Sequence, residues 1–137
     1  MQDITKRFTA ALEELHKSRD AGPLAELFAE NATLSKAGMP HEEHGQAGAK
    51  TFWQQYRDVF DTIEAKFHHV VHDDGIAYLE WTSKGTLSDG NEFRYDGISV
   101  LEAQDDAIDA FQQFGIRELA RTGQTAMARG DVWTTDV

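Results

Sequence analysis

The sequence predicts an α+β fold, in which three N-terminal helices pack on a curved antiparallel sheet and enclose a pocket. Apolar residues in the first part of the chain recur at steps of three and four, which is typical of helices. After residue 62 they alternate with polar residues, which is typical of half-buried strands. Because the helical and strand patterns are segregated along the chain, an antiparallel meander is expected rather than a parallel sheet.

Two helices are expected in the N-terminal part of the chain. An apolar stripe at helical spacing marks the first one, over residues 3–20: Ile4, Phe8, Ala11, Leu12 and Leu15. Gly22 can end this helix in a left-handed conformation, and Pro23 suits the first turn of the next helix. The inner face of this short second helix is predicted to carry Leu24, Leu27 and Phe28.

A third helix is expected after a short strand and a polar loop. The strand is predicted over residues 32–37 and the loop over residues 38–48. The helix is predicted over residues 46–61, and aromatic side chains dominate its buried stripe: Ala49, Phe52, Trp53, Tyr56, Val59 and Phe60.

Four further strands complete the predicted sheet. Alternating residues place them over 63–72, 76–87, 93–102 and 107–114. Turns are expected at Asp74 and Gly75, at Asp89 and Gly90, and over residues 104–106. Residues 116–121 are expected to add one helical turn and to end a domain of residues 1–121. Two interpretations are open for the polar tail of residues 122–137, which is either disordered or strapped onto the sheet.

Composition limits the function classes. The chain has no cysteine, which excludes disulfides, thiolate catalysis and Cys-ligated zinc. Its formal net charge of −11 repels phosphate backbones and anionic lipids, so neither a nucleic acid nor a membrane is an expected partner. Charges occur throughout the first twenty residues, and no apolar run is long enough to span a bilayer. We therefore expect no signal peptide and a cytoplasmic location.

Several short motifs occur in a characteristic order. They are residues 7–12 and 24–33 in the first two predicted helices, His44, Gly45 and Gln46 before the third, and residues 79–82, 95–101 and 111–114 on the strands. Over residues 3–119 this order resembles the nuclear-transport-factor-2-like superfamily, in particular its SnoaL-like polyketide-cyclase branch. The resemblance implies a cone-shaped fold with a deep pocket and a homodimer, for which the outer face of the sheet is the expected interface. It does not fix an activity, because isomerases, cyclases, epoxide hydrolases, dehydratases and non-catalytic binders share this fold.

Asp96 is the main catalytic candidate. If Asp89 and Gly90 form a two-residue turn, Ser83 pairs with Asp96 on the side of the sheet that faces the helices. An apolar site disfavours the charged form of a carboxyl group, which can then act as an acid, a base or a hydrogen-bond donor. Two alternatives are an ion pair with Arg94, which would keep the carboxylate ionised, and a turn at residues 96–97. A register slip of one residue would exchange the two faces.

Only some residues of the enzyme sites known in this superfamily have counterparts in this sequence. Asp96 matches an aspartate of the oxyanion hole of ketosteroid isomerases, but the tyrosine of that site falls at Phe8 and its general-base aspartate falls near Lys36. Gln112 and Gln113 lie near the point where cyclases and epoxide hydrolases carry a catalytic aspartate. An amide cannot take up a proton at neutral pH, although it can orient a water molecule or a carbonyl group.

The pocket is predicted to bind a small hydrophobic ligand. Its expected ligand-binding residues are mostly apolar or aromatic: Phe8, Phe52, Trp53, Tyr56, Trp81, Arg94, Ile98 and Phe114. No cofactor is expected, since no glycine-rich loop connects a strand to a helix. No metal is expected either, because alternation places His68 and His72 on one face of a strand and His69 on the other.

Two functions are compatible with these features. One is an isomerase, cyclase or dehydratase that uses cofactor-free acid/base chemistry. Asp96 would then be its donor or base, Gln112 an orienting amide, and Tyr56 or His44 an auxiliary group. The other is a non-catalytic module for ligand binding or dimerisation.

Overall fold

The computed structural model describes residues 1–115, which form three helices and one six-stranded sheet. The helices are α1 (Gln2–Ser18), α2 (Gly22–Ala25) and α3 (Gly45–Asp58). The strands are β1 (Phe28–Lys36), β2 (Glu42–His44), β3 (Phe60–Asp73), β4 (Ile76–Leu87), β5 (Glu92–Gln104) and β6 (Ala107–Gly115). Their order in the sheet is β2-β1-β6-β5-β4-β3, and every neighbouring pair except β1 and β6 is antiparallel. The α+β class is therefore confirmed.

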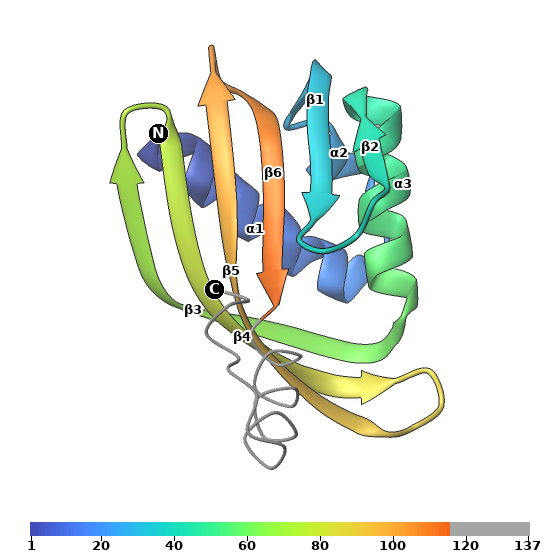
Figure 1. Ribbon diagram of the computed structural model, residues 1–137. Helices are drawn as coiled ribbons and strands as arrows, with labels where there is room; N and C mark the ends of the chain where they lie inside the picture. The colour runs from blue at the N-terminus through green and yellow to red at the C-terminus, as the bar shows by residue number, and fades with distance from the viewer. Residues whose placement is uncertain (116–137) are drawn as a thin grey trace.

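The helices and the sheet form two layers. Helix α1 runs diagonally across one face of the sheet, α3 lies beside β1 and β2, and the long strands β3, β4 and β5 bend strongly (Figure 1). Three nearly fully buried rings join the layers: Phe8 of α1, Trp53 of α3 and Phe111 of β6. The centroid of the Trp53 ring lies 4.8 Å from that of Phe111 and 5.8 Å from that of Phe8. This aromatic cluster fixes the distance between the helices and the sheet.

The segment after α1 differs from the expectation. Helix α2 ends at Ala25, and Phe28 begins β1 instead of belonging to the helix. The strand starts early because β6 offers it a partner: the backbone N–H of Ile108 donates to the carbonyl oxygen of Leu27 at 2.8 Å. The predicted loop of residues 38–48 also contains the short strand β2, which pairs with β1.

The hairpin between β4 and β5 has a longer loop than the predicted two-residue turn. The backbone N–H of Leu87 donates to the carbonyl oxygen of Asn91 at 2.8 Å, so that three residues form the loop. Its last residue, Gly90, has a φ of 87°, as expected when a type I turn is followed by a left-handed residue. The extra loop residue shifts the register of β5 against β4 by one position.

The shifted register exchanges the two faces of β5. Ser83 pairs with Tyr95, and it is Thr82 that pairs with Asp96. Because successive side chains of a strand point to opposite faces, Asp96 lies on the face away from the helices. The predicted inward position of Asp96 is wrong for this reason.

Two predictions remain, one about membrane-spanning segments and one about the residues that follow the last strand. Among residues 1–115, no helix is long and apolar enough to cross a membrane. The expected helical turn of residues 116–121 and the polar tail of residues 122–137 lie outside the described residues.

Candidate functional site

A chamber lies between the inner face of the sheet and the helices α1 and α3. Its outer part has a volume of about 330 Å³ and its inner part a volume of about 20 Å³. Four residues line both parts: Tyr56, Trp81, Ser83 and Gln113. Apart from Ser99, the rest of the inner part is apolar or aromatic, with Phe8, Leu12, Trp53 and Phe67, whereas the outer part adds Lys36, Met39, Phe60 and Tyr95. The polar groups thus converge at the junction of the two parts.

The floor of the chamber depends on a glycine of β5. Gly97 pairs with Trp81, and a Cβ atom at Gly97 would lie 2.5 Å from Cζ2 of the indole. The missing side chain lets the Trp81 ring lie across β5, where its Nε1–H donates to Oγ of Ser99 at 2.9 Å. The indole therefore presents its apolar surface to the chamber, since its one polar group is already paired.

The central polar contact of the site joins two helices. Nε2 of His16 in α1 lies 2.8 Å from the phenolic oxygen of Tyr56 in α3. Tyr56 also makes a hydrogen bond with Ser83 of β4. Tyr56 lines both parts of the chamber, so the contact holds one hydroxyl group at the junction from three separate elements.

Burial keeps both partners of this contact neutral. It raises the pKa of the Tyr56 phenol well above its ordinary value, although the Ser83 hydrogen bond acts in the opposite direction. Burial also lowers the pKa of His16 to about 4; the nearby Arg57 guanidinium adds to this effect and Glu13 opposes it. Near neutral pH the pair is a phenol and an uncharged imidazole, and the tautomer decides which of them donates.

Lys36 lies at the mouth of the chamber. Its strand position faces Gln113 across the β1–β6 pair, and its Nζ atom lies 5.7 Å from the centroid of the Phe52 ring. The residue is exposed overall, and desolvation of part of its side chain lowers its pKa. Among the lining residues described for both parts, Lys36 is the one with a charged side chain, and none is a carboxylate. The chamber thus combines one cationic group with apolar walls.

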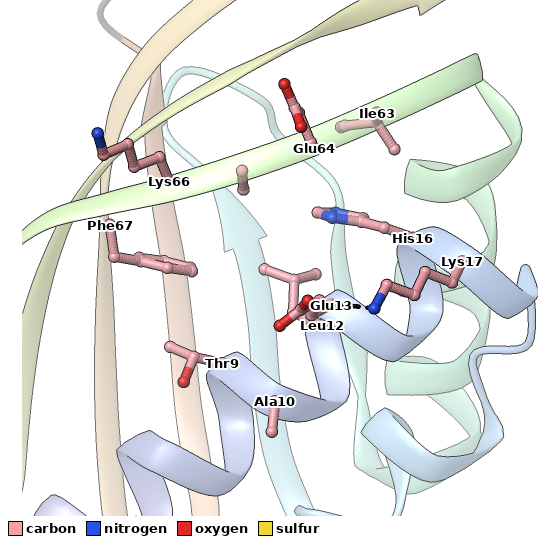
Figure 2. A pocket seen from close by; sticks show the side chains of 11 residues that line it. Thr9, Ala10, Leu12, Glu13, His16, Lys17, Ile63, Glu64, Lys66 and Phe67 are labelled. Atoms are coloured by element: carbon pink, nitrogen blue, oxygen red, sulfur yellow. Dashed lines mark ion pairs between the residues drawn. The ribbon is translucent and has the colours of Figure 1, made fainter.

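A second cavity, of about 630 Å³, lies between α1 and β3 (Figure 2). Its rim carries charged side chains from both elements, among them Glu13 and Lys17, whose ion pair of 3.3 Å is highly exposed. Its floor is apolar, with Leu12, Ala65 and Phe67. His16 also lines this groove, and Leu12, Ala65 and Phe67 line both the groove and the inner part of the chamber. We regard the chamber as the better candidate site because polar groups from several elements converge there.

The two catalytic candidates from the sequence lie on the outer face. Oδ1 of Asp96 accepts a hydrogen bond from the Thr82 hydroxyl at 2.7 Å and lies 3.6 Å from Nη2 of Arg94. The alternative interpretation of Asp96, an ion pair with Arg94, is therefore present in the structure. Gln112 pairs with Val100 and is exposed, whereas its neighbour Gln113 lines the chamber.

The expected ligand-binding residues divide into three groups: those that line the chamber, one that is buried beside it, and those that face outward. Phe8, Trp53, Tyr56 and Trp81 line the chamber. Phe52 is buried beside it, in contact with Trp53 and Phe111. The remaining three occupy outward positions that follow from the shifted register: Arg94, Ile98 and Phe114. Their inward placement is wrong for the same reason as that of Asp96.

The histidines of β3 depart from simple alternation. A bulge between Phe67 and His69 brings two consecutive histidines to the outer face. Nε2 of His68 lies 2.8 Å from Oγ1 of Thr82, and Nδ1 of His69 lies 2.8 Å from Oε1 of Glu80. The expectation that they point to opposite faces is therefore wrong. Within residues 1–115, no group of three or more histidine or carboxylate residues could hold a metal ion.

His16 and Lys36 were not singled out as site residues from the sequence, and of the neighbours Gln112 and Gln113 only Gln112 was chosen. His16 carries a readable signal, since it continues the series Ile4, Phe8 and Leu12 at steps of four on the buried side of α1. A polar residue in such a series has to find a partner inside the protein. Lys36 and Gln113 give no comparable signal, because their faces depend on strand register.

Comparison with known protein families assigns the chain to a family. The family model of the SnoaL-like domain matches residues 5–111, which is well over half of the sequence. The chain belongs to the SnoaL-like family. The predicted resemblance is thereby confirmed. A second model, for the small subunit of acetolactate synthase, matches only residues 101–130. No curated protein matches this SnoaL-like chain.

Solved structures of similar fold include an epoxide hydrolase and a protein co-crystallised with a small molecule. An NTF2-like protein from Anabaena variabilis has a TM-score of 0.76 at 13% identity, covering 83% of this chain and 87% of the other. An LEH-like epoxide hydrolase from M. tuberculosis has a TM-score of 0.64 at 15% identity, covering 80% and 76%. TerC, co-crystallised with polyporic acid, has a TM-score of 0.66 at 13% identity, covering 80% and 89%. At these identities the likeness shows the fold alone.

Proposed function

We propose that this SnoaL-like protein binds a small, mostly apolar molecule in its chamber. The observation that carries the proposal is the convergence of Tyr56, Ser83 and Gln113 at the junction of two apolar spaces. Ligand pockets typically combine hydrophobic and aromatic walls with a few polar groups that orient the ligand. The related fold of TerC, which was co-crystallised with polyporic acid, is consistent with this kind of use.

Tyr56 and Gln113 would orient the ligand. When Nε2 of His16 and the Ser83 hydroxyl both donate to the phenolic oxygen, the Tyr56 O–H is free to donate into the chamber. The side-chain amide of Gln113 can both donate and accept. A carbonyl or hydroxyl oxygen on the ligand would therefore find partners at the junction, while its apolar body contacts Trp81 and Phe60.

Two neighbouring glutamines provide a matched test. Gln113→Trp would fill the junction of the chamber, whereas Gln112→Trp would place the same ring on the outer face. Binding of 2-naphthamide, a neutral bicyclic amide, would be measured by isothermal titration calorimetry, with circular dichroism to verify folding. We expect wild type and Gln112→Trp to bind and Gln113→Trp to lose binding. Equal binding by two folded variants would place the ligand outside the chamber and refute the proposal.

A cofactor-free acid/base enzyme is the second candidate, and the hydrogen bond between Tyr56 and His16 favours it. A phenol held in an apolar site can stabilise negative charge that develops on a ligand oxygen. In an enolisation, a C–H bond next to a carbonyl group breaks, its proton passes to water or hydroxide, and the resulting enolate oxygen accepts the Tyr56 hydrogen bond. No carboxylate is among the described lining residues to serve as the base, which is why binding is our first proposal.

Proton exchange separates the two candidates. Deuterium incorporation next to the carbonyl group of 1-tetralone would be followed by NMR with wild type, Tyr56→Phe and, as a control on the outer face, Asp96→Asn. The enzyme proposal predicts exchange above the buffer rate for wild type and Asp96→Asn, and its loss in Tyr56→Phe. Exchange at the buffer rate in the presence of wild type would leave ligand binding as the function.

A further inference from the structure

The charge of the chamber suggests which molecules it takes. Lys36 supplies the one charged side chain among the described lining residues, in a chain whose formal net charge is −11. Among residues 1–115, no carboxylate forms an ion pair with Lys36; the cations that do form such pairs lie elsewhere on the surface. The ammonium group instead lies over the ring of Phe52, with Nζ 5.7 Å from the centroid.

Lys36 lies on the inner face of the sheet and lines the outer part of the chamber. Lys36 has the same strand parity as the buried residues Ala32 and Leu34, so its side chain starts on the inner face of the sheet. Its strand partner is Gln113, which lines both parts of the chamber. The other residues that line the outer part are apolar or uncharged and polar. The negative charge that would pair with this cation can therefore come from the ligand.

The remaining polar groups of the chamber favour the same ligand chemistry. The indole N–H of Trp53, in the wall of the inner part, has no hydrogen-bond partner among the described residues. Tyr56 and Gln113 can donate as well. Donors in the inner part and at the junction, with a cation in the lining of the outer part and no carboxylate in the described lining, can receive oxygen acceptors.

We propose that the chamber takes a small apolar acid, whose anionic oxygen pairs with the ammonium group of Lys36 while its hydrocarbon body lies between the aromatic walls. The anionic oxygen can belong to a carboxylate, a phenolate or an enolate, since each offers the same charge to Lys36. This inference rests on the proposed ligand-binding function of the chamber and narrows its ligand class.

A pair of nearly isosteric compounds tests the charge preference. 2-Naphthoate and 2-naphthamide share the same ring system and differ in charge at neutral pH. Their dissociation constants would be measured by isothermal titration calorimetry for wild type, Lys36→Met, Lys36→Arg and Lys50→Met. Lys50 is exposed on α3 and absent from the chamber lining, so Lys50→Met makes the same change in net charge away from the site.

The expected pattern separates this inference from the function on which it rests. Wild type and Lys50→Met should bind 2-naphthoate about tenfold more tightly than 2-naphthamide, as one hydrogen bond to a charged group would give. Lys36→Met should remove that preference, Lys36→Arg should keep most of it, and added salt should weaken only the binding of 2-naphthoate. If 2-naphthamide binds and wild type shows no preference, or if the preference survives in Lys36→Met, the anionic-ligand inference is overturned. If neither compound binds, the proposed function fails together with it.

Discussion

The phenolic oxygen of Tyr56 lies 2.8 Å from Nε2 of His16, a residue 40 positions earlier in the chain. The contact ties α3 to α1 and holds a neutral hydroxyl group at the junction of the chamber. It therefore has two consequences that can be measured separately, one for the stability of the fold and one for the ligand.

Removing the Tyr56 hydroxyl should destabilise the protein moderately. Tyr56→Phe keeps the ring, which packs edge-on against Trp53 and Phe60, but leaves Nε2 of the buried His16 without its partner. We expect the free energy of unfolding to fall by about 1–3 kcal/mol, the cost of leaving a buried polar group unpaired. Urea denaturation at pH 7.5 measures this change. An unchanged midpoint and slope would contradict the contribution assigned to the contact.

His16 should make the stability of the fold depend on pH. Its folded pKa of about 4 lies below the ordinary value of 6.5, so between these two values the unfolded chain binds more protons than the folded one. The free energy of unfolding should therefore fall as the pH decreases through this window, by at most about 3 kcal/mol from His16. His16→Gln removes this titration. Wild-type and variant stabilities, measured by urea denaturation from pH 7.5 to pH 4.5, should show a steeper loss for wild type, and parallel curves would contradict this assignment.

Gly97 should tolerate no side chain. A Cβ atom there would lie 2.5 Å from Cζ2 of the Trp81 side chain. It would also lie 2.6 Å from the carbonyl oxygen of Phe114, which is a backbone atom. Gly97→Ala should move the indole and disturb the β5–β6 pairing, with a loss of about 1–3 kcal/mol, as for other overpacked sites. Gly90→Ala is less suitable as a control because of its positive φ, whereas Gly115→Ala meets no atom within 4 Å. Thermal unfolding of both alanine variants should show a large shift only for Gly97→Ala, and equal shifts would count against the close packing of Trp81.

We propose that the outer face of the sheet forms the interface of a homodimer. Several apolar side chains gather there beside Asp96 and Thr82, and Phe114 and Tyr78 are 39% and 43% exposed. Phe114→Glu would place a charge in this patch and should convert a dimer into a monomer without loss of 2-naphthamide binding. Sedimentation equilibrium measures the mass, and a wild-type protein that is monomeric at all concentrations tested would refute the interface.

The sequence predicts the elements of this fold better than it predicts the faces of the strands. Apolar spacing located α1, α3 and the strand Ile76–Leu87 because these patterns are long and regular. The turn at Asp74 and Gly75 also has the predicted length, since Asp73 pairs with Ile76. These features depend on local residue types and conformations, which a single sequence records directly.

The position of Asp96 could not be predicted with the same security. A two-residue and a three-residue loop both fit the turn-forming residues around Gly90, yet they send Asp96 to opposite faces. The bulge that brings His68 and His69 to the same face is likewise invisible in an alternating pattern. Such a single-residue shift turns Asp96 to the outer face, whereas the positions of Tyr56 and His16 do not depend on strand register because both residues lie on helices.

The central claim is that the chamber on the inner face of the sheet receives the ligand. The side-chain amide signals of Gln112 and Gln113 test it most directly, because these neighbours lie on opposite faces of β6 and their NH₂ groups give separate peaks in ¹H–¹⁵N NMR spectra. If the ligand lies in the chamber, titration with 2-naphthamide should shift the Gln113 side-chain peaks progressively and leave those of Gln112 unchanged. Saturable binding that shifts the Gln112 peaks and leaves those of Gln113 unchanged would contradict it.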